Sequence, residues 1–246
     1  MSALSWTILF SVIAAGATVA GGLAVTLPRG MGRHRLSHGI AFGAGYMLAA
    51  AFVSMVPESF ARVPQASVWI LAGYVLAHLF EHTFTPHFHF GEETHAEHHT
   101  EPAVGLTALV GLALHAFFDG VAISAGFQLT AALGIFIALA VILHKIPEGV
   151  TIASVMMASG ASQRRAIDST LLLAAATLAG ALLMSRLEHV AGPALALSCG
   201  IAVYVAATDL IPEFNQQREK RFSVSALLGL VLYFGLHRLL HVLGVH

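Results

Sequence analysis

The sequence has few charged residues and almost no cysteine. Charged side chains make up 10% of its 246 residues and hydrophobic ones 57%, whereas about 25% of the residues of soluble globular proteins are charged. The only cysteine, Cys199, has no second thiol in the chain with which to form a disulfide. A net charge of −1 gives no reason to expect a nucleic-acid partner. These shortages exclude a soluble domain and indicate a polytopic membrane protein.

Two short patterns are also missing. The first residues, Met1–Trp6, lack the basic region of a secretory signal peptide, so we expect the first apolar segment to stay as an uncleaved helix. The chain contains no His-Glu-x-x-His run, which is the zinc-binding helix of many metalloproteases. Neither secretion nor that kind of hydrolysis is therefore indicated.

Long apolar segments fill most of the chain. A window of about 20 residues, the length that a helix needs to cross a bilayer, predicts an all-α membrane protein with eight transmembrane helices. Loops with charged, proline and glycine residues separate most of them, and residues 1–246 form a single membrane domain. The predicted helices cover 5–27, 36–61, 67–85, 103–127, 131–159, 166–187, 192–213 and 223–243.

Lysine and arginine residues gather in the loops after the first, fifth and seventh segments. Cytoplasmic loops of membrane proteins carry an excess of these residues, so both termini are expected outside the cytoplasm and segment 86–102 inside. These loops hold Arg29, Arg33, Arg35, Arg164, Arg165, Arg218, Lys220 and Arg221. The opposite side holds Arg62, Arg186 and Arg238, and Lys145 lies inside the membrane.

The fourth and fifth segments carry nearly the same sequence motif, and we call the two copies the twin motifs. His115 precedes Asp119 by four residues, and His144 precedes Glu148 by four, which puts each pair on one face of a helix. A central Asp costs about 2.5–3.5 kcal/mol in a bilayer, so two matched pairs imply a function. Two imidazoles and two carboxylates suit zinc, and iron or manganese could also use them. Hydrogen-bonded pairs that only tie helices together are the alternative.

A second echo supports an internal repeat. Met55-Val-Pro-Glu58 resembles Leu210-Ile-Pro-Glu213, and the two runs close the second and seventh segments on opposite faces of the membrane. Inverted repeats have this pattern and place their substrate site near the bilayer midplane. Within the fifth segment, Pro147 removes the backbone hydrogen bond to the carbonyl of Leu143, which leaves that oxygen free to face a polar cavity or to kink the helix.

The run His-Lys-Ile-Pro-Glu-Gly at 144–149, the eight segments and the histidine-rich loop resemble the ZIP (Zrt-, Irt-like protein) family of divalent metal transporters. The resemblance implies movement of zinc, or of iron, manganese or cadmium, into the cytoplasm, with His115, Asp119, His144 and Glu148 as metal ligands. It also implies a 3+2+3 inverted-repeat arrangement, an elevator-like movement of one helix bundle against another, and a homodimer. No cofactor beyond the transported ion is expected, and the location is the plasma membrane, or the inner membrane in a bacterium.

The sequence departs from this family at the second metal site. Members with two metals carry an amide or an acid after each motif histidine, where this chain has Ala116 and Lys145. The sixth segment offers only Asp168, close to its cytoplasmic start. We therefore predict a mononuclear site, with the Lys145 ammonium where a second cation would sit, or simply paired with a carboxylate. Phe118 replaces the proline expected on the fourth segment, so a kink is not predicted there.

Other polar residues mark a candidate path through the membrane. Glu58, on the outer side, is a candidate entrance carboxylate or a helix cap. Asp209 resembles a position where the family often carries an acid, which favours a function. The remaining residues could equally be helix-end side chains that reach the interface. The candidate exit ligands are Asp209, Glu213, His78, Glu81 and His82.

One hydrophilic stretch, within the predicted cytoplasmic loop 86–102, mixes histidine with glutamate. Such residues bind metal weakly in several geometries, and the stretch has no reason to fold without metal. We expect a flexible loop that buffers or senses metal, with a plain solvated linker as the alternative. Its histidines are His87, His89, His95, His98 and His99.

Two other classes of protein remain open. An intramembrane metal hydrolase would need an open coordination position and a general base beyond the four ligands. A proton-coupled carrier of another solute could relay protons through the buried His, Asp, Glu and Lys residues. Such a carrier works after chelation, whereas a metal transporter then has no substrate. We expect a transporter and not an enzyme, with a divalent ion and the lipid bilayer as its partners.

Overall fold

The computed structural model describes residues 2–27, 33–84, 102–211 and 220–244. Within these ranges every regular element is a helix. Seven helices are long and apolar enough to cross a bilayer, and an eighth contains the shorter apolar stretch Ala66–Phe80. The all-α membrane fold is thereby confirmed. The predicted loop 86–102 lies outside the described residues except for Pro102, where a helix begins.

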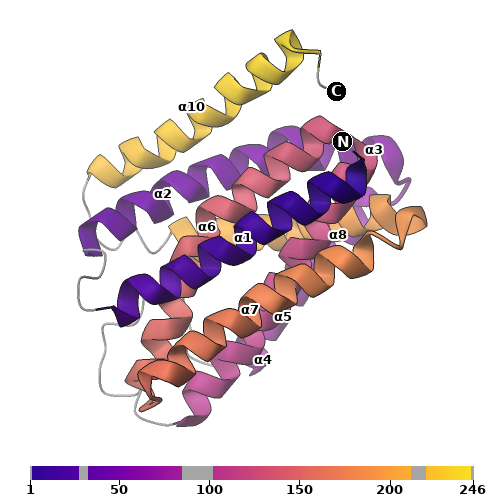
Figure 1. The fold of residues 1–246 in the computed structure, drawn as a ribbon. Coiled ribbons are helices and arrows are strands. Elements are labelled where there is room, and N and C mark those ends of the chain that lie inside the picture. The colour runs from indigo at the N-terminus through magenta and orange to yellow at the C-terminus, as the bar shows by residue number, and fades with distance from the viewer. Residues whose placement is uncertain (1, 28–32, 85–101, 212–219, 245–246) are drawn as a thin grey trace.

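The helices form one bundle with roughly aligned axes, and the two chain ends lie toward the same end of it (Figure 1). The turn between the fourth and fifth spans is tight, because Thr130 accepts a hydrogen bond from the Leu133 N–H and so caps the next helix. The helices are α1 (Ala3–Thr26), α2 (Arg33–Ala49), α3 (Val56–Arg62), α4 (Ala66–Phe84), α5 (Pro102–Leu129), α6 (Ala131–Ala158), α7 (Gln163–Met184), α8 (Ala191–Tyr204) and α10 (Lys220–Val242).

Two stretches of π-helix interrupt the bundle at related places. One, η1 (Ala50–Met55), joins α2 to α3, and the other, η3 (Val205–Leu210), continues α8. Each ends shortly before a Pro-Glu pair of the sequence, although the second pair lies outside the described residues. Such wide turns occur often at functional sites. The sequence similarity between the ends of the second and seventh spans is therefore accompanied by a π-helical stretch in each. A third short element, the 3₁₀ turn η2 (Glu188–Val190), links α7 to α8.

The helices fall into one group of four that pack on one another and a second group made of two pairs. Helices α1, α5, α6 and α7 pack on one another, and α2 packs on α10 as α4 packs on α8. The groups meet mainly where α2 contacts α6 and α8 contacts α5. In Figure 1, α10 lies along α2, while α7 lies along α5.

Glycines set the distance at four of the five most extensive helix crossings. In the crossing of α1 with α6, a Cβ on Gly21 would lie 2.1 Å from the Ile146 carbonyl oxygen, and one on Gly149 would lie 1.9 Å from that of Thr18. No side chain fits such a gap, so the backbones approach directly. The other reciprocal pairs are Gly120 with Gly180 (α5 and α7), Gly45 with Gly229 (α2 and α10), and Gly73 with Gly200 (α4 and α8).

Large apolar side chains are exposed along the outside of the bundle. On α10, Val224, Leu227, Leu228 and Val231 are each more than half exposed. Water would disfavour such a surface, whereas hydrocarbon chains match it. The outer surface therefore fits a multi-pass membrane protein.

Candidate metal site

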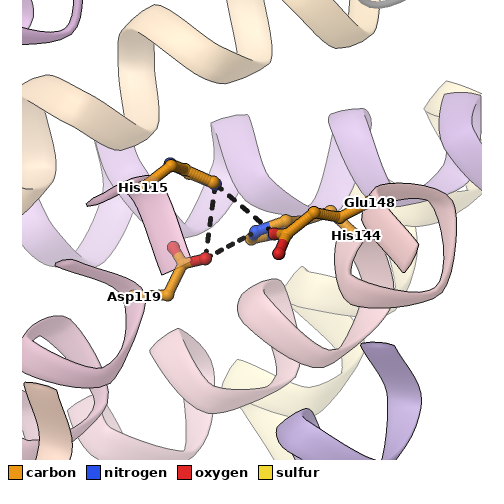
Figure 2. Close-up of side chains that lie close together, drawn as sticks. All are labelled: His115, Asp119, His144 and Glu148. Atoms are coloured by element: carbon orange, nitrogen blue, oxygen red, sulfur yellow. Dashed lines mark hydrogen bonds and ion pairs between the residues drawn. The ribbon is translucent and has the colours of Figure 1, made fainter. Parts of the chain in front are cut away.

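Four potential metal ligands converge between two neighbouring helices. His115 and Asp119 project from α5, and His144 and Glu148 project from α6, so that one ligand atom from each lies within 4.8 Å of the others. The Nε2 atoms of His115 and His144 lie 3.3 Å and 3.2 Å from Asp119 Oδ2. Figure 2 shows these side chains pointing toward one another. The spacing of the twin motifs thus brings all four predicted residues to one place.

The site is inside the bundle. Glu148 is 1% exposed, His144 3% and Asp119 6%, while His115 is partly buried. Burying carboxylates away from water is costly unless cations or hydrogen-bond donors compensate their charge. This cluster therefore requires a compensating positive charge close to both acids.

The packing of α5 and α6 explains why a glycine follows each acid. Gly120 comes directly after Asp119 and touches the backbone of α7, and Gly149 comes directly after Glu148 and touches the backbone of α1. Each acid therefore lies one residue before a point where its helix is in direct backbone contact with a neighbour. The glycine that the twin motifs share therefore has a packing role, and this packing fixes the position of the acid that precedes it.

One histidine has a fixed ring orientation. His144 Nδ1 lies 2.8 Å from the carbonyl oxygen of Ala140. Because a carbonyl only accepts hydrogen bonds, Nδ1 donates here, and Nε2 is left facing Asp119 Oδ2. A backbone partner of this kind orients many metal-binding histidines in proteins. Nε2 of His144 is thus presented as a ligand atom.

Lys145 supplies the positive charge. Its Nζ lies 2.8 Å from Asp119 Oδ2 and 2.6 Å from Glu148 Oε2, and the residue is 0% exposed. One cation thus bridges both acids. The other oxygen of Glu148, Oε1, is buried and has no hydrogen-bond partner among the described residues.

The structure also describes Ala116 and Asp168, two positions where a second metal site would need ligands. Ala116 is fully buried in a small apolar cluster with Leu112, Ile152 and Leu173, where it offers no donor atom. Asp168 is exposed near the start of α7 and does not belong to the group of four. The described residues therefore form one four-residue group of metal-ligand type.

Pro147 affects the backbone beside the site. Helix α6 continues through it to Ala158, but the proline leaves the Leu143 carbonyl without its usual partner. That oxygen faces α2, 3.4 Å from where a Cβ of Gly43 would lie. The freed carbonyl therefore lies at the contact between the two helix groups.

Two cavities lie within the bundle, and one of them is lined by a residue of the site. A small one of about 20 Å³, room for about one water molecule, is lined by Asp119, Phe118, Met55 and Ser198. A larger one of about 250 Å³ is lined by Glu58, Phe136, His237 and His241. Glu58 forms an ion pair with Arg62 there. The sequence does not indicate that His237 and His241 of α10 line a cavity, although they are four residues apart, as are the two residues of each His-acid pair in the site.

The predicted exit ligands are less fully described. His78, on α4, stacks edge-on against the ring of Tyr204, with ring centroids 5.8 Å apart. The backbones of Glu81, His82 and Asp209 are helical, but their side chains lie outside the described part of the structure. The remaining predicted positions lie outside the described residues altogether, namely Glu213, His87, His89, His95, His98 and His99.

The fold and the site together define a class: an all-helical, multi-pass membrane protein with a buried group of two histidines and two acids between neighbouring helices. The family model described as "ZIP Zinc transporter" matches residues 91–240, more than half of the chain. The chain belongs to this family.

Individual relatives agree. The chain is 34% identical to "Zinc transporter SLC39A7" of Homo sapiens over 128 residues, which cover 48% of this chain and 27% of that protein. It is 29% identical to "Zinc transporter foi" of Drosophila melanogaster over 124 residues, 49% of the chain and 18% of the relative. It is 26% identical to "Zinc transporter ZIP10" of Danio rerio over 155 residues, which cover 58% of this chain and 18% of that protein. The chain thus spans about a quarter or less of the length of these relatives.

Proposed function

We propose that this protein carries divalent transition metal ions, zinc above all, across a membrane into the cytoplasm, and that His115, Asp119, His144 and Glu148 hold the ion in transit. The observation that carries the proposal is the meeting of four ligand atoms within 4.8 Å, from two helices, inside an apolar bundle. Two nitrogen and two oxygen ligands complete a tetrahedral zinc site, and the two carboxylates match the charge of one divalent ion.

The ion is held by side chains that replace its hydration shell. Nε2 of His144 is oriented by the Ala140 carbonyl, and Nε2 of His115 comes from the more accessible side chain of the two. Asp119 and Glu148 approach from different helices, so the site can loosen if α5 and α6 shift slightly. Four ligands and one ion favour binding and release over catalysis, which needs an open coordination position.

The packing supports an elevator-like movement. The eight glycines in the reciprocal crossings all make their closest approaches within a helix group: four lock α1, α5, α6 and α7, and four lock α2 to α10 and α4 to α8. The contacts of α2 with α6 and of α8 with α5 join the groups without such a lock. The first group carries the metal site and moves as one body against the second.

The packing also supports a 3+2+3 inverted repeat. If α1, α2 and α4 are exchanged with α7, α8 and α10, and α5 with α6, each major helix pair maps onto another major pair or onto itself. The crossing of α1 with α6 maps onto that of α7 with α5, and the crossing of α2 with α10 onto that of α8 with α4. The reciprocal glycines and the two π-helical stretches follow the same exchange.

The remaining parts of the proposal concern orientation and surroundings. The arginine-rich loops face the cytoplasm, so both termini lie outside, and the protein resides in the plasma membrane as a homodimer. Glu58 and its cavity receive the ion, while Asp209, Glu213 and the residues of α4 pass it to the cytoplasm. The histidines of loop 86–102 bind it there as a buffer.

The test is uptake of radioactive zinc by the purified protein in liposomes, with iron and manganese measured in parallel. We expect saturable uptake that a chelator outside the vesicles abolishes. Absence of uptake for all three metals would contradict the proposal. Solute movement that persists after chelation would instead indicate a proton-coupled carrier, and metal-dependent cleavage of a substrate would indicate a hydrolase.

A further inference from the structure

Lys145 occupies the carboxylate atoms that an ion would need. Its ammonium contacts Asp119 Oδ2 and Glu148 Oε2, and these are the two oxygens that face the imidazole of His115, at 3.3 Å and 3.9 Å. An ion held between the imidazoles and the acids therefore binds oxygens that the ammonium already holds. Two cations on the same oxygen atoms repel each other. The lysine and the cargo compete for the same place.

We propose that Lys145 is a tethered substitute for the cargo, which pairs with the two acids when the site is empty and gives way when a metal ion binds. This inference rests on the proposed transport function. It assigns the lysine a step in the transport cycle, the return of the empty site across the membrane, and so goes beyond a structural ion pair.

The structure offers the displaced ammonium a place to go. Glu148 Oε1 is buried without a hydrogen-bond partner among the described residues, while Oε2 is held by Lys145. A metal ion that takes Oε2 leaves Oε1 as an acceptor for the ammonium. Lys145 can thus remain beside the site and stay paired, which matters because it is 0% exposed and has no contact with solvent.

Formal charges show what the lysine does for the cycle. With Asp119, Glu148 and Lys145 all charged, the empty site carries −1 and the site with a divalent ion carries +1. Without the lysine, the empty site carries −2 and the loaded site is neutral. The cost of taking a charge out of water rises with the square of that charge. With Lys145, the loaded and the empty site therefore carry charges of equal size and cost about the same to move through the membrane. Without it, the empty site costs more to move, while the neutral loaded site does not.

This difference has a measurable consequence. A carrier that cannot return empty still exchanges ions, because each crossing is made with cargo, but it cannot fill a metal-free vesicle beyond its first crossing. Lys145 thus makes the protein a net transporter. An uncharged side chain at this position makes it an exchanger.

The experiment compares two modes of zinc transport in liposomes for the unaltered protein, Lys145→Met and Lys145→Arg. Net uptake is measured into zinc-free vesicles, and exchange is measured as entry of radioactive zinc with equal zinc on both sides, the membrane potential being clamped at zero in both. Methionine keeps much of the length and packing of lysine without its charge, and arginine keeps the charge. We expect the ratio of net uptake to exchange to fall about tenfold or more in Lys145→Met, and to be retained in Lys145→Arg.

Equilibrium zinc binding provides the second measurement. Because no tethered cation competes, Lys145→Met should bind zinc more tightly than the unaltered protein, by about tenfold. If Lys145→Met does not fold, Lys145→Gln takes its place in both measurements. An unchanged ratio of net uptake to exchange, or weaker zinc binding without the lysine, would overturn the inference while leaving the transport function standing. An unaltered protein that performs neither mode would overturn the transport function itself.

Discussion

His144 and His115 contribute to the site in different ways. His144 is almost fully buried and its ring is held by the Ala140 carbonyl, whereas the side chain of His115 is 13% exposed. A fixed ligand preorganises the site, and a more accessible one can meet an arriving ion first. Asp119 Oδ2 lies between them, 3.3 Å from Nε2 of His115 and 3.2 Å from Nε2 of His144, and forms an ion pair with Lys145 Nζ. Because Asp119 and Glu148 carry the negative charge of the group, we expect these two acids to determine how tightly an ion is held.

The first prediction concerns Glu148. Glu148→Gln keeps the shape of the side chain but removes one of the two negative charges that face the ion. Loss of an outer partner of a metal ligand already lowers affinity about 10–100-fold, so we expect zinc affinity to fall by about a hundredfold or more. The measurement is calorimetric titration of the purified protein in detergent.

The matched control is Glu58→Gln, which alters an acid in the larger cavity, outside the group of four. Its zinc affinity at the buried site should stay close to that of the unaltered protein. Equal losses in the two variants would show that the effect of Glu148→Gln is not local to the site.

The second prediction concerns the number of ions. Ala116 and Lys145 stand where a second set of ligands would be required, and the described residues contain one four-residue group. We expect one tightly bound zinc ion per chain. Because the loop histidines can bind zinc as well, the titration uses a variant with His87, His89, His95, His98 and His99 replaced by alanine. Two tightly bound ions in that variant would contradict a mononuclear site.

Among the helices, the reciprocal glycines mark the pairs that approach backbone to backbone, and we expect these pairs to move together. Gly149 and Gly120 lock the metal-binding helices to α1 and α7, and Gly45 with Gly229 locks α2 to α10. Direct backbone contact lets dispersion forces act over the whole crossing, which is how helices associate where lipid removes the hydrophobic driving force. The site is therefore carried by a rigid set of helices.

The third prediction tests one crossing. A Cβ on Gly229 would lie 2.0 Å from the Phe42 carbonyl oxygen, whereas a Cβ on Gly235, on the same helix, meets nothing within 4 Å. Overpacking costs about 1–3 kcal/mol, so Gly229→Ala should lower the thermal midpoint in detergent. Gly235→Ala should leave it unchanged or raise it slightly, since alanine favours helix. Size-exclusion chromatography after heating measures both. Equal midpoints for the two variants would refute the close crossing.

The sequence predicts the helices and the convergence of the four residues, for physical reasons. Apolar runs of about 20 residues have few alternatives to a membrane helix, and a spacing of four residues fixes a helix face. Glycine-rich stretches such as 39–45 suit close helix contacts, but the sequence alone does not show which glycines make them, because Gly45 at a crossing looks the same as Gly235, where a Cβ would meet nothing within 4 Å. The cavity beside Glu58 was also missed, because it depends on where α10 lies against α3 and α6.

At the scale of the whole molecule, the two chain ends and the arginine-rich turns should lie on opposite sides of the membrane. The ends lie toward one end of the bundle in Figure 1. Cys199 is the only cysteine and is fully buried, so a Cys199→Ala chain is a suitable background for labelling. The fold thus allows a direct test of orientation.

The fourth prediction uses single cysteines in that background. Ser2→Cys and Leu243→Cys should react with a membrane-impermeant maleimide in intact cells, because both positions are exposed and are expected outside. Arg164→Cys, exposed at the start of α7, should react only after the membrane is made permeable. Labelling of Arg164→Cys in intact cells, with protection of the other two, would reverse the orientation.

The central claim is that the four buried residues hold the ion that the molecule transports. The most direct measurement is the initial rate of radioactive zinc uptake into liposomes, compared between the unaltered protein and Asp119→Asn at equal amounts of folded protein. We expect saturable uptake by the unaltered protein and a rate near that of empty liposomes for Asp119→Asn, because that acid contacts both imidazoles and Lys145. Undiminished uptake by Asp119→Asn would contradict it.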